Sequence, residues 1–398
     1  MTVDASTSDF DPTAPECVAD PHVMYRRLRA ECPVAHSEAY GGFWTLSRWD
    51  DIERVVTTPE GFSSAHGIIV PRNPASGRRP PMHYDPPEHT AFRKAINPSF
   101  RKDRLVRLEA GLRGATVELV EGAAERGDID AFVDLASPLC ARSVMALLNV
   151  PEHLAGPIAE HGAAFEYAQF AFDAERVEAE NLVLYDLARQ LVAYRHEHPL
   201  DPDEDLISGL LAGAVDGEPI DDETVAGSFR QIAIAGHGAP ALVMASAIAH
   251  LADYPDLADQ LRADPALIPD AVEELLRLYT PNQGFARTVM SDATFEHPGF
   301  GSRTIPQGDV VTIPSTSANR DEALFDRPDE VVLGRPERHV AFGFGVHVCP
   351  GSHIGRLQTR MVLEELLARS TSFEITAAPT FAPFPVYGPM RLPLRIHR

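Results

Sequence analysis

The feature that most limits how this chain can fold is a run of 21 residues without formal charge, 232–252. Such a run is long enough to cross a bilayer. His237, Pro240 and His250 interrupt it, however, and Gly236 and Gly238 flank the first of these. Polar and helix-breaking residues in such a run favour a buried central helix, around which one core packs, over a membrane span.

Helical patterns outnumber strand-like patterns along the rest of the chain. Helices are predicted at residues 21–31, 89–96, 104–126, 135–148, 182–196, 222–251, 254–264, 267–279 and 352–370. Short strands are predicted at 43–46, 286–289, 293–295 and 310–313, with a last hairpin in the proline-rich tail, 382–396. Because the strands do not alternate regularly with the helices, we expect a mainly α fold with small β-sheets.

Composition and charge narrow the class of protein. Nothing in the 398 residues resembles a linker, so we expect one large domain over residues 16–398 after a flexible N-terminus, 1–15. The net charge of −23 argues against binding to nucleic acid or to an anionic membrane. Four scattered cysteines and the lack of a signal peptide indicate a reducing, cytoplasmic compartment. Residues 93–113, by contrast, are mostly basic. This segment is either a solvated helix face or a docking site for an acidic partner.

Cys349 lies in a glycine-rich stretch, HVAFGFGVHVCPGSHIGR at 339–356, just before a predicted helix. A buried structural thiol fits poorly, because the glycines remove the side chains that would cover it. A catalytic nucleophile with His347 or His353 as its base lacks other support for acyl transfer, and a phosphate-binding loop lacks the expected glycine spacing. An axial thiolate bound to haem iron is the interpretation that explains every feature of the stretch. The glycines admit a flat macrocycle, the helix start offers N–H groups to the sulfur, and a histidine can reach a propionate.

The same stretch resembles the signature of the cytochrome P450 family, FGxGxHxCxG. The motif is matched in full by Phe342, Gly343, Gly345, His347, Cys349 and Gly351. The resemblance covers nearly the whole chain and implies a cytochrome P450 fold, in which haem b lies between the central helix and the Cys349 loop and Cys349 binds the iron. The further haem contacts that it implies are His89, Arg93, Ala235 and Arg287. Glu274, Arg277 and Arg335 resemble the buried ExxR network of the family.

The chain departs from the family in the central helix, where AGx[DE]T is usual. Gly238 stands at the acid position and Ala239 at the alcohol position, so both side chains that pass protons to bound oxygen are missing. Pro240 has no N–H and crowds the carbonyl of Gly236. We expect a widened helix groove in which the Gly236 carbonyl and ordered water replace the alcohol. His237 is a weaker candidate, since family histidines at this position face away from the haem.

The resemblance implies a monooxygenase that inserts one oxygen atom of O2 into a C–H bond, by hydroxylation or O-demethylation. Electrons would come from NAD(P)H through a ferredoxin that docks on residues 93–113, as in the soluble bacterial branch. Because the acid and the alcohol are missing, a peroxide-driven or atypical oxidation such as ring coupling stays open. A non-catalytic haem protein that binds or senses a ligand is the third alternative.

The positions that line the substrate pocket in the family also predict a pocket here. Because the residues at these positions are mostly apolar, they favour a small or medium hydrophobic substrate, including an aromatic one. The predicted lining residues are Ile69, Val70, Phe165, Phe170, Ile234, Phe285 and Phe384. Aromatic residues at helical spacing are also typical of a packed core, which is the alternative interpretation of this set. No motif indicates the substrate's identity or the oligomeric state.

Overall fold

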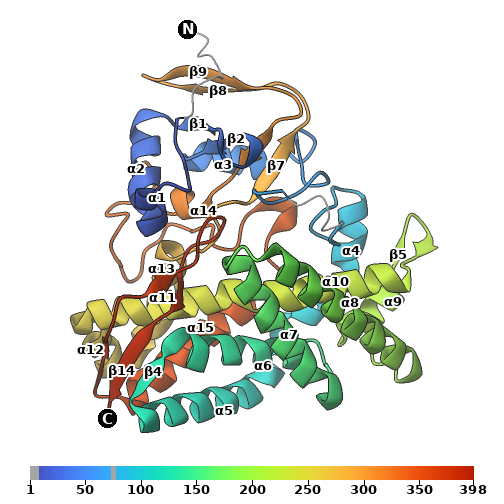
Figure 1. The fold of residues 1–398 in the computed structure, drawn as a ribbon, viewed down its shortest axis with the longest axis vertical. Helices are drawn as coiled ribbons and strands as arrows, with labels where there is room; N and C mark the ends of the chain where they lie inside the picture. Colours follow the sequence, from blue (N-terminus) through green and yellow to red (C-terminus); the bar gives the residue numbers. More distant parts are fainter. Residues whose placement is uncertain (1–8, 73–77) are drawn as a thin grey trace.

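Long helices cross the molecule below a smaller β-rich region (Figure 1). The computed structural model describes residues 9–72 and 78–398. Its helices are α1 (Pro15–Ala19), α2 (Pro21–Glu31), α3 (Trp49–Thr57), α4 (Glu88–Ile96), α5 (Lys102–Arg126), α6 (Ser137–Leu147), α7 (Glu152–Phe170), α8 (Ala174–Glu197), α9 (Leu206–Leu211), α10 (Asp222–Ala235), α11 (Gly238–Asp253), α12 (Pro255–Ala263), α13 (Ile268–Leu278), α14 (Ser315–Ala318) and α15 (Ser352–Arg369). The predicted mainly α fold with small sheets is confirmed.

Within the described ranges the strands form a five-stranded sheet, a three-stranded sheet and two-stranded pairs. The five-stranded sheet has the order β1 (Val34–Ser37), β2 (Phe43–Leu46), β10 (Val310–Thr312), β7 (Ala286–Val289), β3 (Phe62–Ser63). Strands β2 and β10 are parallel, and the other neighbours are antiparallel. The smaller sheets comprise β11 (Ser372–Ile375), β14 (Pro393–His397) and β4 (Asp128–Asp130), then the pairs β12 (Thr380–Phe381) with β13 (Pro389–Arg391), β5 (Ala214–Val215) with β6 (Glu218–Pro219), and β8 (Ala293–His297) with β9 (Gly301–Ile305).

Acidic caps set the start of two helices that the sequence patterns predict well. Asp20 accepts the His22 N–H at 2.9 Å at the start of α2, whose first residue is a proline. Asp221 accepts the N–H and the hydroxyl of Thr224 at 2.9 and 2.7 Å at the start of α10. These caps satisfy N–H groups that the first turn of a helix leaves free. Helix α2 has the predicted bounds, and α10 begins at the predicted residue.

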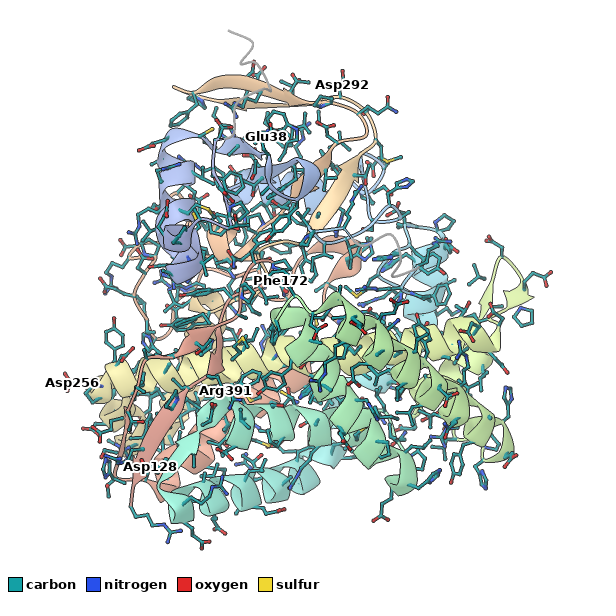
Figure 2. The ribbon with its side chains drawn as sticks, in the orientation of Figure 1. Glu38, Asp128, Phe172, Asp256, Asp292 and Arg391 are labelled. Atoms are coloured by element: carbon teal, nitrogen blue, oxygen red, sulfur yellow. The ribbon has the colours of Figure 1, made fainter. Side chains whose placement is uncertain are left out.

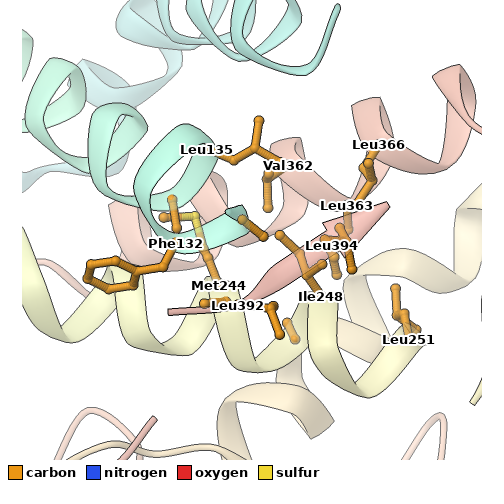
Figure 3. Close-up of a cluster of buried hydrophobic side chains, with 14 of the residues drawn as sticks. Phe132, Leu135, Met244, Ile248, Leu251, Val362, Leu363, Leu366, Leu392 and Leu394 are labelled. Atoms are coloured by element: carbon orange, nitrogen blue, oxygen red, sulfur yellow. The ribbon is translucent and has the colours of Figure 1, made fainter. Parts of the chain in front are cut away.

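The main core lies between α11, α15 and the C-terminal strands, and the close-up in Figure 3 shows part of it. Met244 and Ile248 of α11, Leu363 of α15 and Leu394 of β14 are each fully buried there. Burying one such side chain contributes about 1.5–3 kcal/mol. The run from α10 to α11 is long and apolar enough to span a membrane by length and composition, and 56% of its most apolar window is buried within the protein. The prediction of a buried central helix is therefore confirmed.

The central helix is interrupted, whereas the sequence predicts one continuous helix over 222–251. Gly236 and His237 separate α10 from α11. The His237 N–H bonds the Ile234 carbonyl at 3.0 Å, in a tighter turn. The Gly236 carbonyl accepts no backbone hydrogen bond from the described residues. Because the helix restarts at residue 238, Pro240 lies in the first turn of α11, where its missing N–H is not needed. The predicted disturbance at Gly236 is thus a full break.

Three further differences concern pairing and helix bounds. The tail does not form a hairpin on its own, since β13 pairs with β12 while β14 joins β11 and β4. Helix α8 begins before the predicted residue 182, because Asp173 caps it by accepting the Arg176 N–H at 3.0 Å. The patterns miss α7, in which Gly156 and Pro157 obscure the helical period.

The N-terminus, predicted to be flexible over 1–15, falls into two parts. Residues 1–8 lie outside the described residues. Asp9 accepts the His36 N–H at 2.8 Å, and the Phe10 ring packs edge-on against Phe43 at 5.7 Å between centroids. The chain is therefore anchored from residue 9 onward.

A buried charge network connects α13 to the loop before α15. Arg277, 1% exposed, donates to the two carboxylate oxygens of Glu274 at 2.8 and 2.9 Å. It also donates to the carbonyls of Asn319, Pro328 and Glu330 at 2.9, 2.6 and 2.7 Å. The Arg335 Nε donates to Glu274 at 3.0 Å. The expected network of Glu274, Arg277 and Arg335 is confirmed.

Replacing Arg277 with lysine should destabilise the fold strongly. An ammonium cannot reproduce the planar set of donors, so Glu274 and the carbonyls lose buried partners, at a cost of about 3 kcal/mol or more. Denaturant unfolding of Arg277→Lys measures this loss. The matched control is Arg395→Lys. Its pair with Asp128, at 2.8 Å, is solvent-exposed, so this change should leave stability nearly unaltered. Equal losses in the two variants would contradict the assignment.

Candidate functional site

The loop that carries Cys349 is held by hydrogen bonds from its own backbone. The Val340 N–H donates to the Asn319 side-chain oxygen at 2.7 Å. The Cys349 N–H donates to the Phe342 carbonyl at 2.8 Å. Arg277 donates a hydrogen bond to the backbone carbonyl of the same Asn319. The buried network of α13 therefore positions the cysteine loop.

Two glycines allow this loop to approach α3. Gly343 and Gly345 have φ angles of 70° and 67°, a left-handed region that favours glycine. A Cβ on Gly345 would also lie 2.5 Å from the carbonyl oxygen of Val56 in α3. A side chain at residue 345 would therefore push the loop away from the helix.

Cys349 and its surroundings suit a metal-bound thiolate beneath a flat apolar group. Burial raises the pKa of the Cys349 thiol, while the Gly351 N–H, Arg93 and Arg356 act in the opposite direction. A bound cation removes the proton from such a thiol outright. Cys349 is packed among other atoms but still has accessible surface on one side. Ala235, in the central helix, is exposed as well. Val348 is 41% exposed. The loop and the central helix both leave apolar surface uncovered, which a macrocycle would cover.

Four cationic or potentially cationic side chains gather close to this loop. His89 and Arg287 are buried, and the rings of His89 and His347 lie 4.2 Å apart. Burial and neighbouring positive charge lower the pKa of His89 to about 4, that of His347 to about 2 and, through burial, that of Arg287 to about 10. Arg93 contributes to both histidine shifts. Asp85 partly offsets this charge, but it also accepts the Ser64 N–H at 2.9 Å.

This excess of positive charge fits the two propionates of haem. Burial of unpaired cations is costly, and two carboxylates would supply the missing counter-charge. The predicted contacts His89, Arg93, Arg287 and His347 are therefore brought together by the fold. Together with the chemistry of Cys349, the residues present fit haem. The ring of Phe342, in the cysteine loop, lies 4.5 Å from the Arg356 guanidinium of α15.

The break in the central helix holds a carboxylate that the sequence patterns miss. Glu166 of α7 is buried, and its Oε2 lies 3.0 Å from the Nδ1 of His237. A Cβ on Gly238 would lie 2.8 Å from the Glu166 Cδ. The acid that Gly238 lacks is thus replaced in space by an acid from another helix. Its position at the N-terminus of α11 also suits a negative charge.

His237 faces Glu166 of α7 and Ser137 of α6. Its Nε2 lies 2.8 Å from the Ser137 hydroxyl, and the side chain is buried. Burial alone would lower the pKa of His237, but the charge and the hydrogen bond of Glu166 raise it. Gly236, next to it, packs on α6, where a Cβ would lie 2.6 Å from a methyl of Val144.

The predicted substrate residues fall into separate groups. Val70 and Phe384 both lie against Gly284, next to Phe285, and Ile69 pairs with Phe285 through the backbone. Phe384 is buried and stacks on Tyr40 with ring centroids 5.7 Å apart. This first group thus joins the loop after β3 to the strand β7 region and to the tail.

The second group lies on α7 and α10. Phe165 is 1% exposed, Phe170 packs at the edge of the main core, and Ile234 lines a small hollow with His237 between α6, α7 and α10. Phe172, 56% exposed, follows in the turn before α8 and lies where the helical part meets the upper region (Figure 2). The role of both groups in substrate binding stays a prediction.

The basic segment 93–113 is largely neutralised by nearby acids. Arg107 bonds Glu204 at 2.6 Å, and Arg113 bonds Glu365 at 2.7 Å. Arg104 is 3% exposed and donates to the Ser99 carbonyl. Arg101 is exposed but lies 3.6 Å from Asp103 and 3.8 Å from Glu204. Lys94 and Lys102 stay exposed. A docking face would therefore be smaller than the sequence suggests.

Comparisons with known proteins identify the family and the fold. The family model described as Cytochrome P450 matches residues 174–382. Cytochrome P450-terp of a Pseudomonas species is 30% identical, with 96% of this chain and 95% of that protein covered. Cytochrome P450 109 of Bacillus spizizenii is 28% identical, with 94% and 92% covered. The solved structure of cytochrome P450 CYP109Q5 from Chondromyces apiculatus is similar at a TM-score of 0.85 and 28% identity, with 98% of both chains covered.

A methyl group at residue 238 should destabilise the protein through Glu166. Gly238→Ala introduces a clash with a buried, paired carboxylate, and such overpacking costs about 1–3 kcal/mol. In a Glu166→Ala background the same change should cost little, so a double-mutant cycle of unfolding free energies should be non-additive. Gly114→Ala is the control, because a Cβ there meets nothing within 4 Å. Additive effects would show that the carboxylate does not occupy this space.

Proposed function

Because the chain belongs to the cytochrome P450 family of haem monooxygenases, we propose that it oxidises a C–H bond of a small or medium hydrophobic substrate. The reaction R–H + O2 + 2 electrons + 2 H⁺ → R–OH + H2O covers hydroxylation. On a methoxy carbon it gives O-demethylation, since the hydroxylated carbon then leaves as formaldehyde. Haem b, when bound, would supply the redox centre at which O2 is reduced.

The observation that carries the proposal is the pairing of Cys349 with an unbalanced group of cations. Cys349 would hold the iron, in a loop shaped by Phe342, Gly343 and Gly351. His89, Arg93, Arg287 and His347 would hold the propionates, and Ala235 would face the macrocycle from the central helix. The predicted apolar pocket residues would exclude water and orient the substrate. They are Ile69, Val70, Phe165, Phe170, Ile234, Phe285 and Phe384.

Glu166 would handle protons in place of the missing acid. Its carboxylate lies at the helix break, where Gly238 leaves room for it and His237 holds it in place. The free Gly236 carbonyl lies at the same break and can hold a water molecule. With Ala239 at the alcohol position, we propose that Glu166 passes protons through water held at Gly236.

Electrons would come from NAD(P)H through a separate ferredoxin in the cytoplasm. The exposed cations Lys94 and Lys102 are the candidates for its docking face. Attraction between these cations and an acidic ferredoxin would weaken as salt screens it. The KM for ferredoxin should therefore rise with ionic strength, and a KM independent of salt would argue against this face.

The specific alternative is oxidation driven by hydrogen peroxide, which the missing acid and alcohol pair favours. Glu166→Gln separates the two functions, for any substrate found to bind the holoenzyme. Under the proposed function the variant should lose turnover with NADH, ferredoxin and reductase by on the order of 100-fold. Peroxide-driven turnover should persist, because peroxide already carries the needed protons.

The control is Glu180→Gln. Glu180 of α8 forms a similar pair with His161 of α7, at 2.7 Å. It should leave both rates unchanged. Equal NADH-driven rates in Glu166→Gln and the parent would remove Glu166 from the mechanism. Turnover by the parent with peroxide but not with NADH, ferredoxin and reductase would favour the alternative, and no turnover with either would favour a ligand-binding haem protein.

A further inference from the structure

The first half of the central helix carries a buried arginine that has no acidic partner. Arg230 of α10 is 4% exposed. Its guanidinium lies 4.6 Å from the ring centroid of Phe165 and 5.7 Å from that of Tyr185. Among the described residues no carboxylate acts on its charge, and its Nε is buried without a hydrogen-bond partner. Aromatic faces offset part of the cost of this charge, but they do not neutralise it.

A second guanidinium without an acid approaches the first. Arg79, in the loop between β3 and α4, also has a buried Nε that lacks a partner among the described residues. Burial, and after it the charge of Arg79, lower the pKa of Arg230 to about 10. The undescribed residues of this loop, 73–77, read Asn-Pro-Ala-Ser-Gly and include no acid.

The same place offers a third polar group. Gln231 is buried, its Nε2 meets the sulfur of Met82 at 3.2 Å, and its Oε1 has no partner among the described residues. The contact with Met82 also shows that the Arg79 loop packs on α10. An amide with one weak contact and one unused atom can turn to donate to an anion.

This pair of arginines is separate from the group that suits the propionates. Arg230 packs on Phe165 of α7 and Tyr185 of α8. His89 and His347 pack instead on each other beside the Cys349 loop. The two groups therefore suit two different anions.

The pair also lies at a useful distance from the reaction centre. Arg230 precedes Ala235 by five residues, which is about 7.5 Å along the axis of an α-helix and about 140° around it. A substrate with its anion at Arg230 would therefore need a hydrophobic body of one or two rings, extending along and around α10, to reach the space beside Ala235.

We propose that Arg79 and Arg230 bind an anionic group at one end of the substrate, so that the substrate is a hydrophobic carboxylic acid or phosphate monoester. This inference rests on the proposed function and names its substrate class. Two guanidiniums with paired donors match the geometry of either anion. The bound anion would supply the negative charge that the protein does not place beside the two arginines. The apolar residues of the pocket would hold the remainder of the substrate.

Calorimetric titration of the holoenzyme tests the proposal without any turnover. The probes are benzoate, 2-naphthoate, 4-phenylbutyrate and decanoate, each compared with its primary amide, together with 2-naphthyl phosphate. At least one acid or the phosphate should bind about tenfold or more tightly than its neutral counterpart, which corresponds to about 1.4 kcal/mol. Preference for naphthoate or naphthyl phosphate identifies the anion. If no anion binds more tightly than its amide or naphthol counterpart, the proposal is overturned.

The variant Arg230→Gln should abolish this preference while leaving the affinity for the amides unchanged. Arg189→Gln is the matched control, because Arg189 also lies near Tyr185, at 5.8 Å, but is exposed and paired with Glu223 at 2.6 Å. It should keep the preference for anions. An unchanged preference in Arg230→Gln would contradict the assignment, even if the protein proved inactive in every turnover assay.

Thermal unfolding gives a second readout that does not depend on the probes. An unpaired buried charge destabilises the free protein, so Arg230→Met should raise the melting temperature or leave it unchanged. The parent should gain stability from the preferred anion, and the variant should not. A clearly lowered melting temperature would assign Arg230 a structural role and would overturn the proposal.

Discussion

The bidentate pair between Glu274 and Arg277 is the contact on which the site depends. Its carboxylate also holds Arg335, and its guanidinium holds the Asn319 carbonyl. Asn319 then fixes the Val340 N–H at 2.7 Å, nine residues before Cys349 along the chain. The loop can therefore be rich in glycine and still have one conformation, because its order comes from a network outside it.

Two places in the molecule hold buried charge that the protein itself does not balance. The group around His347 has more cations than acids, and Arg79 and Arg230 lack acids altogether. Each arrangement costs stability in the free protein, and such costs concentrate at functional sites. The first fits a cofactor and the second fits a substrate, since an unmatched buried charge indicates what binds beside it. Glu166 differs from both, because His237 pairs with it at 3.0 Å in the space left by Gly238.

Local signals in the sequence predict the fold well where one segment decides the outcome. Asp20 and Asp221 are caps next to clear helical periods, and the helices start where those caps predict. The spacing around Cys349 likewise predicts the cysteine loop, because its glycines are needed locally. The break at Gly236 and His237 was only partly predictable. Pro240 indicates a disturbance, but the packing of α7 against Gly238 decides where the helix restarts.

Features that join distant segments could not be predicted from one sequence. Glu166 lies in the aromatic run FEYAQFAF, and its charge in an apolar stretch was the available signal. Arg230 likewise stands just before the charge-free run, but its lack of a partner appears only when Arg79 and Phe165 are placed beside it. The basic segment 93–113 shows the converse, because Glu204 and Glu365, far along the chain, neutralise much of it.

The central claim is that the Cys349 sulfur binds haem iron as a thiolate. The most direct measurement is the carbon monoxide difference spectrum of the reduced protein, recorded beside a Cys349→Ser variant. The account predicts the long-wavelength absorption band of a thiolate-bound haem in the parent and its absence in the variant. The same band in both proteins, or a purified parent that binds no haem, would contradict it.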